Sequence, residues 1–356
     1  MVINLNKDFW IGKRVLLTGH SGFKGSWMTK LLSKLGSIVY GYSLKPNTQP
    51  NLSEILRIDE LCHSNYDDIN NFHNLKEYFF SINPDIIFHF AAQPIVLKSY
   101  ELPIDTIKTN VIGLANLLEL VRFSNKFLSV VIITSDKCYK KNAHNLPHKE
   151  SDSLGGSDPY SASKACAEII SESYRDSFFS NKNSSQIATA RAGNVIGGGD
   201  WSEYRLITDI VRYIWEENTK LELRYPSAVR PWQHVLEPIN GYINLAEKLY
   251  KFPGKFNKAW NFGPTDLVEF KVSDIIKTFE KKLNINIKYS NFNNIKNESA
   301  YLSLDSSSSN KNLSWVNKLT TKEAIEWTID WYENFYKGFD SVSFTESQID
   351  KFINIK

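Results

Sequence analysis

The chain has 356 residues, of which 42% are apolar and 23% are charged, and its formal net charge is +3. This length and apolar content predict a folded α/β unit with a smaller companion, which excludes a disordered or fibrous chain. The lysines and arginines are dispersed along the sequence, which argues against nucleic acid as a partner.

No segment of the sequence has the features of a membrane anchor or a leader. The first ten residues lack the apolar core of a signal peptide, and no apolar run approaches the ~18 residues of a membrane span. The three cysteines, Cys62, Cys138 and Cys166, have neither C-x-x-C nor metal-ligand spacing, so neither disulfides nor a metal site are indicated. We expect a cytoplasmic protein without membrane contact.

The first predicted element is a buried strand over 14–17 that leads into a glycine-rich loop over 18–25. A helix is predicted next, because apolar residues recur every three or four positions at Trp27, Met28, Leu31, Leu32 and Leu35. Gly36 stands where a helix C-cap would. Strand, glycine turn and helix are the setting in which a dinucleotide's pyrophosphate binds at a helix N-terminus.

The second predicted strand, 38–44, does not reveal which dinucleotide binds. A fold that prefers NAD commonly places an acidic residue there, and one that prefers NADP an arginine. Neither is present, and Lys45 is only a weak candidate for a 2′-phosphate. Within the glycine loop, His20 and Lys24 are unusual, and they either contact the cofactor or point into solvent.

Two further motifs supply chemistry. The run Thr134-Ser135-Asp136-Lys137 follows a predicted strand, and Asp158-Pro159-Tyr160 opens a helix that also carries Lys164. Tyr160 and Lys164 are four residues apart and share one helix face, so the ammonium can lie beside the phenol and favour the phenolate. Taken alone, such a pair is also common on helix surfaces. The preceding glycine loop and the serine that ends a strand favour the catalytic interpretation.

Strands and helices alternate up to about Ala192, which predicts a doubly wound parallel sheet. From Gly193 the chain is loop-rich and aromatic, with helices predicted near 238–252, 272–283 and 321–337. Trp201 and Trp232 in this part are better explained as walls or core than as substrate readers.

The glycine loop, Ser135 and the Tyr160/Lys164 pair together resemble the extended branch of the short-chain dehydrogenase/reductase superfamily. The strings 190–201 and 230–238 resemble, more specifically, sugar-nucleotide 4,6-dehydratases that act on CDP-sugars, and the likeness spans roughly residues 10–265. It implies an NAD-binding Rossmann domain over 1–193, to which 234–250 returns. A smaller substrate-binding lobe would take 194–233 and 251–356.

The resemblance also implies roles for individual residues. Catalysis would fall to Ser135, Asp136, Lys137, Tyr160 and Lys164. NAD would contact Tyr160, Lys164 and a set made of Gly19, His20, Gly22, Phe23, Lys24, Gly25, Asp68, Ile69, Ala91, Ala92, Gln93 and Asn110. The CDP-sugar would contact Asn194, Arg205, Arg230 and His234. Arg191 and Arg230 could instead be structural ion-pair partners.

The implied reaction is a dehydration. Tyr160, helped by Ser135 and Lys164, would deprotonate the sugar 4-hydroxyl as carbon 4 is oxidised. Lys137 would then remove the proton at carbon 5, and Asp136 would protonate the departing 6-hydroxyl. Most sugar-nucleotide dehydratases carry glutamate where this chain has Lys137. Asp136 and Lys137 could otherwise be ordinary turn residues.

Other functions remain open at this point. An epimerase or decarboxylase of the same branch would have a non-acidic residue in place of Asp136, and a non-catalytic NAD-binding regulator would ordinarily lack Tyr160 or Lys164.

The superfamily also implies a homodimer or tetramer, in which the Tyr160 helix and the helix that begins near Asp105 pair across a two-fold axis. The apolar residues of the latter, Val111, Leu114, Leu117, Leu118 and Val121, could instead face the sheet.

Overall fold

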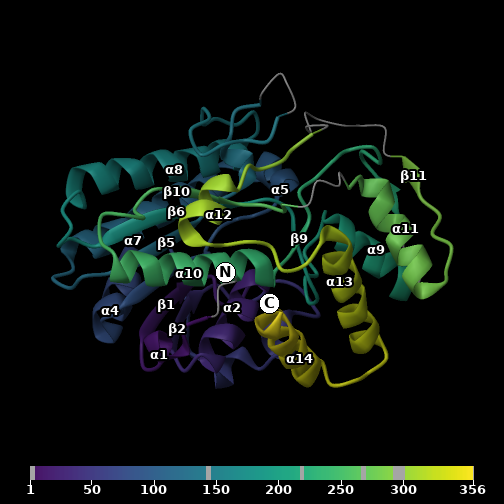
Figure 1. Cartoon of the computed structure of the whole chain (residues 1–356), viewed down its shortest axis with the longest axis horizontal. Helices are drawn as coiled ribbons and strands as arrows, with labels where there is room; N and C mark the ends of the chain where they lie inside the picture. The colour runs from purple at the N-terminus through teal and green to yellow at the C-terminus, as the bar shows by residue number, and fades with distance from the viewer. Residues whose placement is uncertain (1–4, 142–145, 217–219, 266–269, 292–300, 356) are drawn as a thin grey trace.

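The computed structural model describes residues 5–141, 146–216, 220–265, 270–291 and 301–355, and its centre is a parallel sheet (Figure 1). Within these ranges the strand order is β3-β2-β1-β4-β5-β6-β10, and every neighbouring pair is parallel. The strands are β1 (Arg14–Thr18), β2 (Ile38–Ser43), β3 (His63–Tyr66), β4 (Ile86–His89), β5 (Ser129–Ile133), β6 (Gln186–Ala192) and β10 (Ala259–Phe262). The predicted doubly wound fold is confirmed.

Helices cover both faces of the sheet because alternate strand residues point to opposite sides. Val15 and Leu17 belong to the apolar cluster that includes α2 (Phe23–Lys34) and α10 (Leu236–Lys251). Leu16 belongs to the cluster on the other face, with helices α4 (Phe72–Ile82), α7 (Gly113–Phe123) and α8 (Pro159–Phe178). The strand ends near Thr18 and Ile133 therefore lie at one edge, where loops and helix N-termini meet.

The first predicted helix begins and ends close to the positions that the sequence indicates. Helix α2 runs from Phe23 to Lys34, and Gly36 follows in a left-handed conformation with φ of +86°. The Ser37 amide donates to the Leu32 carbonyl at 3.1 Å, which satisfies one of the carbonyls at the helix end. The C-cap prediction is confirmed.

The segment before α7 differs from the single helix that the sequence suggests. It consists of α5 (Val96–Glu101), α6 (Pro103–Ile107) and a π-helical turn (Lys108–Ile112). Leu114, Leu117, Leu118 and Val121 are buried against the sheet. The alternative in which these residues face the sheet is therefore correct. The exposed apolar residues are Ile104, Ile107 and Ile112, at 61%, 43% and 50% of full exposure.

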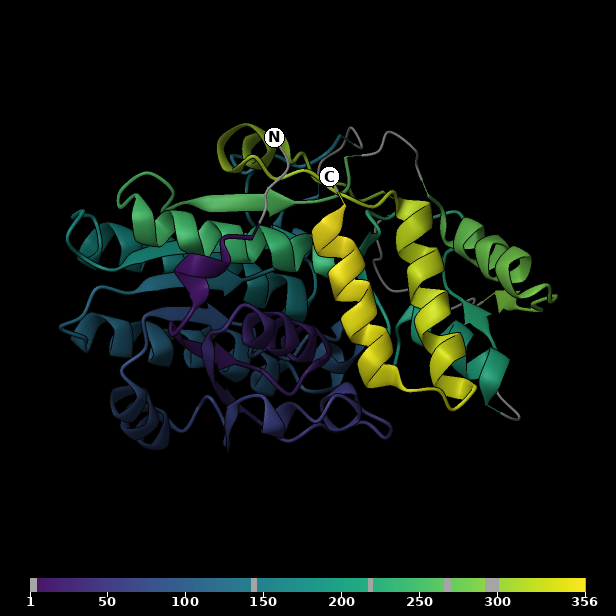
Figure 2. The same cartoon turned by 60° about the horizontal axis from the view of Figure 1, so that its bottom comes forward.

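The later chain forms a smaller lobe at one end of the sheet. Figure 2 shows its two C-terminal helices, α13 (Thr321–Tyr336) and α14 (Ser341–Asn354), side by side in yellow. A hydrogen bond of 2.8 Å from Trp331 Nε1 to Thr345 Oγ1 joins them. The other lobe elements are α9 (Leu206–Trp215), α11 (Val272–Leu283), β7 (Val195–Ile196), β8 (Glu222–Leu223), β9 (Gln233–His234) and β11 (Ser290–Asn291). Helix α12 (Ser307–Leu313) instead packs on α10 and β10, at the main sheet (Figure 1).

One strand lies outside the domain to which we assigned it. β10 pairs with β6 at the edge of the main sheet, although 251–356 was assigned to the substrate lobe. The returning segment thus extends past α10, and the rest of the division into domains remains a prediction.

The remaining short elements are α1 (Lys7–Trp10), α3 (Leu52–Ile55) and the 3₁₀ turns η1 (Ile58–Glu60) and η3 (Asp136–Cys138). Among the described residues, no helix combines the length and apolarity needed to cross a bilayer.

The contact between Gly198 and Trp331 predicts a strong stability effect. A Cβ at Gly198 would lie 1.9 Å from Trp331 Cγ, and the Gly198 carbonyl accepts a hydrogen bond of 3.0 Å from Trp27 Nε1. We expect Gly198→Ala to lower the free energy of unfolding in urea by about 1–3 kcal/mol or more, because the buried tryptophan must move. Gly22→Ala is the control, since its nearest neighbour would be 3.4 Å away. Equal midpoints for the two variants would contradict the argument.

Candidate active site

The end of β5 presents a serine and a buried carboxylate. Ser135 caps the 3₁₀ turn η3 by accepting from the Lys137 amide at 3.2 Å, and its hydroxyl donates to Asp136 Oδ1 at 2.9 Å. Asp136 is 3% exposed, and its Oδ2 has no hydrogen-bond partner within the described structure. Burial raises the pKa of Asp136, although the Lys137 charge, Ser135 and more distant cations oppose this. A carboxyl group in this setting is suited to hold and donate a proton.

The N-terminus of α8 brings the tyrosine to the same place. Asp158 caps the helix by accepting from the Ser161 amide at 2.9 Å, Pro159 occupies the first turn, and the Tyr160 amide donates to Ser99 Oγ at 3.1 Å. Burial raises the pKa of the Tyr160 phenol to about 12, and a hydrogen bond with Ser135 lowers it only in part. The structure thus brings together Ser135, Asp136 and Tyr160, as the sequence predicts.

The Lys164 ammonium is bound by a backbone carbonyl rather than by the phenol. Its Nζ donates to the Ile133 carbonyl at 3.3 Å, and within the described residues it makes no hydrogen bond with Tyr160. Burial lowers the pKa of Lys164 to about 8, and the charge of Glu168 raises it. In the protein alone burial keeps the phenol protonated near neutrality, so the expectation that Tyr160 acts as a base with the help of Lys164 stays a prediction.

Cations surround this cluster on the side of the smaller lobe. Lys24, in the first turn of α2, interacts electrostatically with Arg205, Lys164 and Asp136, and burial lowers its pKa to about 7. Arg205 forms an ion pair with Asp200 at 2.6 Å. Arg230 is 7% exposed and also lowers the pKa of Asp136. Lys24 and Arg230 therefore act on the Asp136 carboxyl group, and Arg205 acts on Tyr160.

His234 is placed differently from the other predicted substrate residues. Its ring is fully buried between the indoles of Trp27 and Trp327, each with its centroid 5.7 Å away. Nδ1 accepts from the Leu236 amide at 3.3 Å, and burial lowers the pKa of His234 to about 3. These contacts give the residue a packing role rather than a place among the catalytic side chains. Asn194 is partly buried, and its carbonyl accepts from the Gln233 amide at 3.0 Å.

The glycine loop forms a cradle that fits a dinucleotide. A Cβ at Gly25 would lie 2.1 Å from the Gly19 carbonyl oxygen, and one at Gly19 would lie 2.8 Å from the Ala91 nitrogen. Gly22 caps α2 without a side chain, and no acidic residue lies in the helix's first turn. The free amides and positive end of the helix dipole are therefore available to a diphosphate. Phe23 lies behind this loop, 3.3 Å from a Cβ built on Gly197.

His20 is fully enclosed beneath the loop. Its Nδ1 and Nε2 lie 3.0 Å from the hydroxyls of Ser43 and Ser64, respectively. A Cβ at Gly41 would lie 2.3 Å from the His20 ring, so only glycine leaves room for it. Burial lowers the pKa of His20 to about 4. Both ring nitrogens already have partners, and a cofactor contact by this side chain remains a prediction.

The other predicted cofactor residues line the ends of β3 and β4. Asp68 Oδ1 accepts from the Asn70 backbone and side chain, both at 2.9 Å, and buried Ile69 packs on Gly113. The Ala91 amide donates to Thr18 Oγ1 at 3.2 Å, and Ala92 follows in the same loop.

Asn110 connects this loop to α8. The Gln93 amide donates to Asn110 Oδ1, and Asn110 Nδ2 donates to Ser163 Oγ, both at 2.8 Å. Asn110 lies in the π-helical turn, a distortion that often occurs at functional sites. The side chain of Gln93 is directed to Ile95 and Thr106. The NAD contacts predicted for these residues therefore stay predictions, with Asn110 holding the loop in place.

Sequence reasoning missed a buried polar network behind the catalytic residues. Glu168 binds the hydroxyls of Thr134 and Thr189, and Arg191 donates to the same carboxylate at 2.8 Å. Arg191 also donates to the Tyr139 hydroxyl at 2.8 Å. This confirms the alternative that Arg191 is a structural ion-pair partner. The spacing of Glu168, four residues after Lys164, is the signal that could have revealed it.

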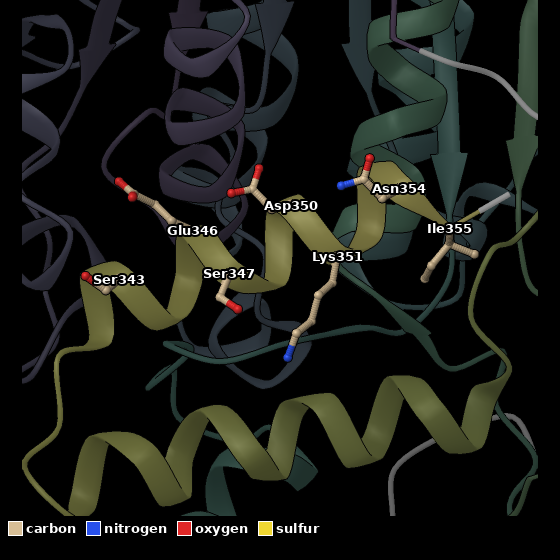
Figure 3. A pocket seen from close by; sticks show the side chains of 7 residues that line it. All are labelled: Ser343, Glu346, Ser347, Asp350, Lys351, Asn354 and Ile355. Carbon is tan, nitrogen blue, oxygen red and sulfur yellow. The ribbon is translucent and has the colours of Figure 1, made fainter.

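Figure 3 shows a hollow elsewhere on the molecule, on the outer side of α14, lined by Ser343, Glu346, Ser347, Asp350, Lys351, Asn354 and Ile355. Glu346 and Asp350 are engaged with α2 through ion pairs with Lys30 at 2.6 Å and Lys34 at 2.7 Å. The hollow contains none of the predicted catalytic or binding residues. All of its lining residues belong to α14 or directly follow it, so we assign it no function.

Comparison with known sequences gives one relative of 42% identity over nearly the whole chain and more distant relatives over parts of it. The family model described as GDP-mannose 4,6 dehydratase matches residues 16–328. The CDP-glucose 4,6-dehydratase of Salmonella typhimurium strain LT2 is 42% identical over 358 residues, covering 98% of this chain and 99% of that protein. The dTDP-D-glucose 4,6-dehydratase of Dictyostelium discoideum is 25% identical, covering 79% of this chain and 64% of that protein.

Solved structures show the same fold at lower identity. The dTDP-glucose 4,6-dehydratase of Bacillus anthracis strain Ames, in complex with NAD, aligns with a TM-score of 0.75 and 22% identity, covering 93% of this chain and 100% of that one. The UDP-glucose 4-epimerase of Thermotoga maritima, with UDP-glucose, aligns with a TM-score of 0.78 and 20% identity, covering 90% and 99%. These likenesses support the extended Rossmann architecture.

Proposed function

The chain belongs to the GDP-mannose 4,6-dehydratase family, and from this we propose that it is an NAD-dependent CDP-glucose 4,6-dehydratase. The product would be CDP-4-dehydro-6-deoxy-D-glucose, with one water released, as a step of deoxysugar biosynthesis. The observation that carries the proposal is the juxtaposition of Ser135, Asp136 and Tyr160 in a chain 42% identical to a CDP-glucose 4,6-dehydratase over 98% of its length.

The first half-reaction falls to Tyr160. The positive charges of Lys164 and of bound NAD would favour its phenolate, which takes the proton of the sugar 4-hydroxyl with Ser135 close by. Bound NAD supplies hydride chemistry, accepting the hydride from carbon 4 and returning it to carbon 6. The glycine cradle around Gly19 and Gly25 would hold its diphosphate, and Lys164, whose Nζ donates to the Ile133 carbonyl, would also help to hold it.

The second half-reaction uses the pair that follows Ser135. A ketone at carbon 4 acidifies the hydrogen at carbon 5, and Lys137 is proposed to remove it. Asp136, whose buried carboxyl favours the protonated form, gives its proton to the departing 6-hydroxyl. The bond between carbon 6 and oxygen breaks as the carbon 5 to carbon 6 double bond forms, and water leaves. When the hydride returns to carbon 6, Lys137 would give its proton back to carbon 5, which completes the 4-keto-6-deoxy product.

Substrate binding is proposed for the cations on the side of the smaller lobe. Arg205 and Arg230 both act electrostatically on the catalytic cluster, and guanidinium groups suit the diphosphate of a nucleotide sugar. Asn194 is a candidate donor to the same substrate. His234 is a weaker candidate, because its ring lies between two tryptophans.

The substrate assignment is tested by supplying CDP-, dTDP-, UDP- and GDP-glucose to the purified protein with NAD. We expect the largest kcat/KM for CDP-glucose, with a 4-keto product detected by its absorbance in alkali. A higher value for another base would overturn the choice of CDP. A product inverted at carbon 4 would indicate an epimerase instead.

We also propose that the protein is a homodimer, or a tetramer built from that dimer. An apolar patch formed by Leu102, Ile104, Ile107, Ile112 and Ile169 lies on α6, the π-helical turn and α8, with each residue at least 42% exposed. Helices α6 and α8 and the π-helical turn are in contact with one another, which places these residues on neighbouring elements. Contiguous exposed apolar surface of this kind marks an interface, and the superfamily pairs these helices across a two-fold axis.

The dimer predicts a result for Ile107→Glu combined with Ile169→Glu. The double variant should be monomeric by light scattering at micromolar concentration, while the wild type is dimeric, because two buried charges would oppose association. Phe339→Glu, at a residue 62% exposed outside the patch, should stay dimeric. Cys166, the exposed cysteine of α8, should react faster with a maleimide in the monomeric variant. A monomeric wild type would contradict the proposal.

We propose a cytoplasmic location for this activity. Cys62, Cys138 and Cys166 are all free thiols, which fits a reducing compartment.

A further inference from the structure

Glu168 is a buried carboxylate on the helix that carries the catalytic tyrosine and lysine. It lies four residues after Lys164 and eight after Tyr160, so the three side chains follow one face of α8. Glu168 is 3% exposed. A carboxylate this deeply buried requires partners for both oxygens, since an unpaired buried charge is costly.

Both oxygens of Glu168 have partners, and these partners come from two strands. Oε1 accepts from the Thr134 hydroxyl, which directly precedes Ser135 at the end of β5. Oε2 accepts from Thr189 Oγ1 at 2.6 Å and from Arg191 Nη2 at 2.8 Å, both on β6. The carboxylate therefore ties α8 to the ends of the two strands that carry and support the catalytic serine and aspartate.

The same carboxylate supplies negative charge beside Lys164. The groups that interact with Lys164 are Glu168 on its own helix, Cys138 after β5, Lys24 on α2 and His89 on β4. Burial lowers the pKa of His89 to about 3 and raises that of the Cys138 thiol well above its usual range. Both groups are therefore neutral near pH 7, and Lys24 is cationic or neutral. Glu168 is the anion of this set.

We propose that Glu168 is a positioning residue for the dehydration. Through Thr134, Thr189 and Arg191 it fixes α8, and with it Tyr160 and Lys164, against Ser135, and it places a negative charge one helical turn from Lys164. This inference rests on the proposed function. It goes beyond the ion pair with Arg191, because a purely structural pair would hold the core together without setting the charge of Lys164. The two roles differ in the pH dependence of turnover.

The test compares Glu168→Gln with Glu168→Asp in the holoenzyme with CDP-glucose. Glutamine removes the charge that raises the pKa of Lys164, so Lys164 loses its proton at lower pH. The alkaline limb of kcat should then move to lower pH by about one unit or more. Aspartate keeps the charge but shortens the reach to Thr134 and Thr189. We expect kcat to fall by about 10–10²-fold, with the alkaline limb close to that of the wild type.

The matched control is Glu119→Gln. Glu119 also pairs with an arginine, Arg122, at 2.7 Å, but it lies on α7 and does not act on Lys164. Its kcat and pH profile should equal those of the wild type. If Glu168→Gln does not fold, Glu168→Asp decides: a wild-type kcat would overturn the positioning role. A soluble Glu168→Gln variant with an unshifted alkaline limb would also overturn the inference. A wild type inactive on CDP-glucose would refute the proposed function instead.

Discussion

Replacing Lys137 with alanine is expected to stop the reaction after carbon 4 is oxidised and before water leaves. Tyr160 and Ser135 do not depend on the Lys137 side chain, whose backbone amide alone binds Ser135 at 3.2 Å. On adding CDP-glucose, absorbance at 340 nm from reduced cofactor should therefore rise and persist. We expect kcat for dehydration to fall by about 10²–10⁴-fold, the range typical of a lost general base.

Loss of Lys137 also removes a charge beside Asp136, which raises the pKa of that carboxyl further and favours its acid form. The stall would thus reflect loss of the base and not of the acid. Lys140→Ala is the control, because Lys140 is exposed and lies three residues further along. An alanine variant at position 137 that dehydrates at a near wild-type rate, with solvent deuterium still entering at carbon 5, would assign the base to another residue.

Tyr160→Phe should block the preceding step, so that absorbance at 340 nm does not rise and no 4-keto product forms. The buried phenol is the group that we expect to touch the 4-hydroxyl, and its loss should lower kcat by about 10²–10⁴-fold. Phenylalanine fills the same space, so the free energy of unfolding should change little.

Tyr250→Phe provides the comparison for Tyr160→Phe. Tyr250 lies on α10, with its ring against Phe9 and Phe127, away from the catalytic cluster. It should keep wild-type activity. A 4-keto product that forms in Tyr160→Phe as fast as in the wild type would show that another group takes the proton.

The central sheet and the catalytic cluster could be predicted from the sequence because both depend on local patterns. Buried strands appear in the sequence as short apolar runs. The glycine loop before Trp27 is typical of the turn between a strand and a helix in a dinucleotide-binding fold. Ser135 and Tyr160 follow a strand end and a helix start, which parallel topology brings to one edge of the sheet. Their mutual contacts are as expected.

Features that depend on contacts between distant parts of the chain could not be predicted from the sequence. β10 is a four-residue strand containing Asn261, and only its pairing with β6 places it in the sheet. The apolar stripe that includes Leu117 could face either the sheet or a partner, and one helix pattern cannot choose between them. The sequence alone predicts Glu168 at the surface, because charged residues are seldom buried unless they are paired. Its partners lie on or beside strands β5 and β6, far away in the sequence. The burial that keeps Tyr160 neutral is likewise a tertiary effect.

The most direct test of the dehydratase assignment follows a deuterium label placed at carbon 4 of CDP-glucose. Incubation with the protein and NAD in ordinary water, followed by NMR of the product, should place the deuterium on the new methyl group at carbon 6. The pyridine nucleotide should show no net reduction, because the reaction is redox-neutral. Deuterium retained at carbon 4 of an inverted sugar, or lost to the pyridine nucleotide without a 6-deoxy product, would contradict the account.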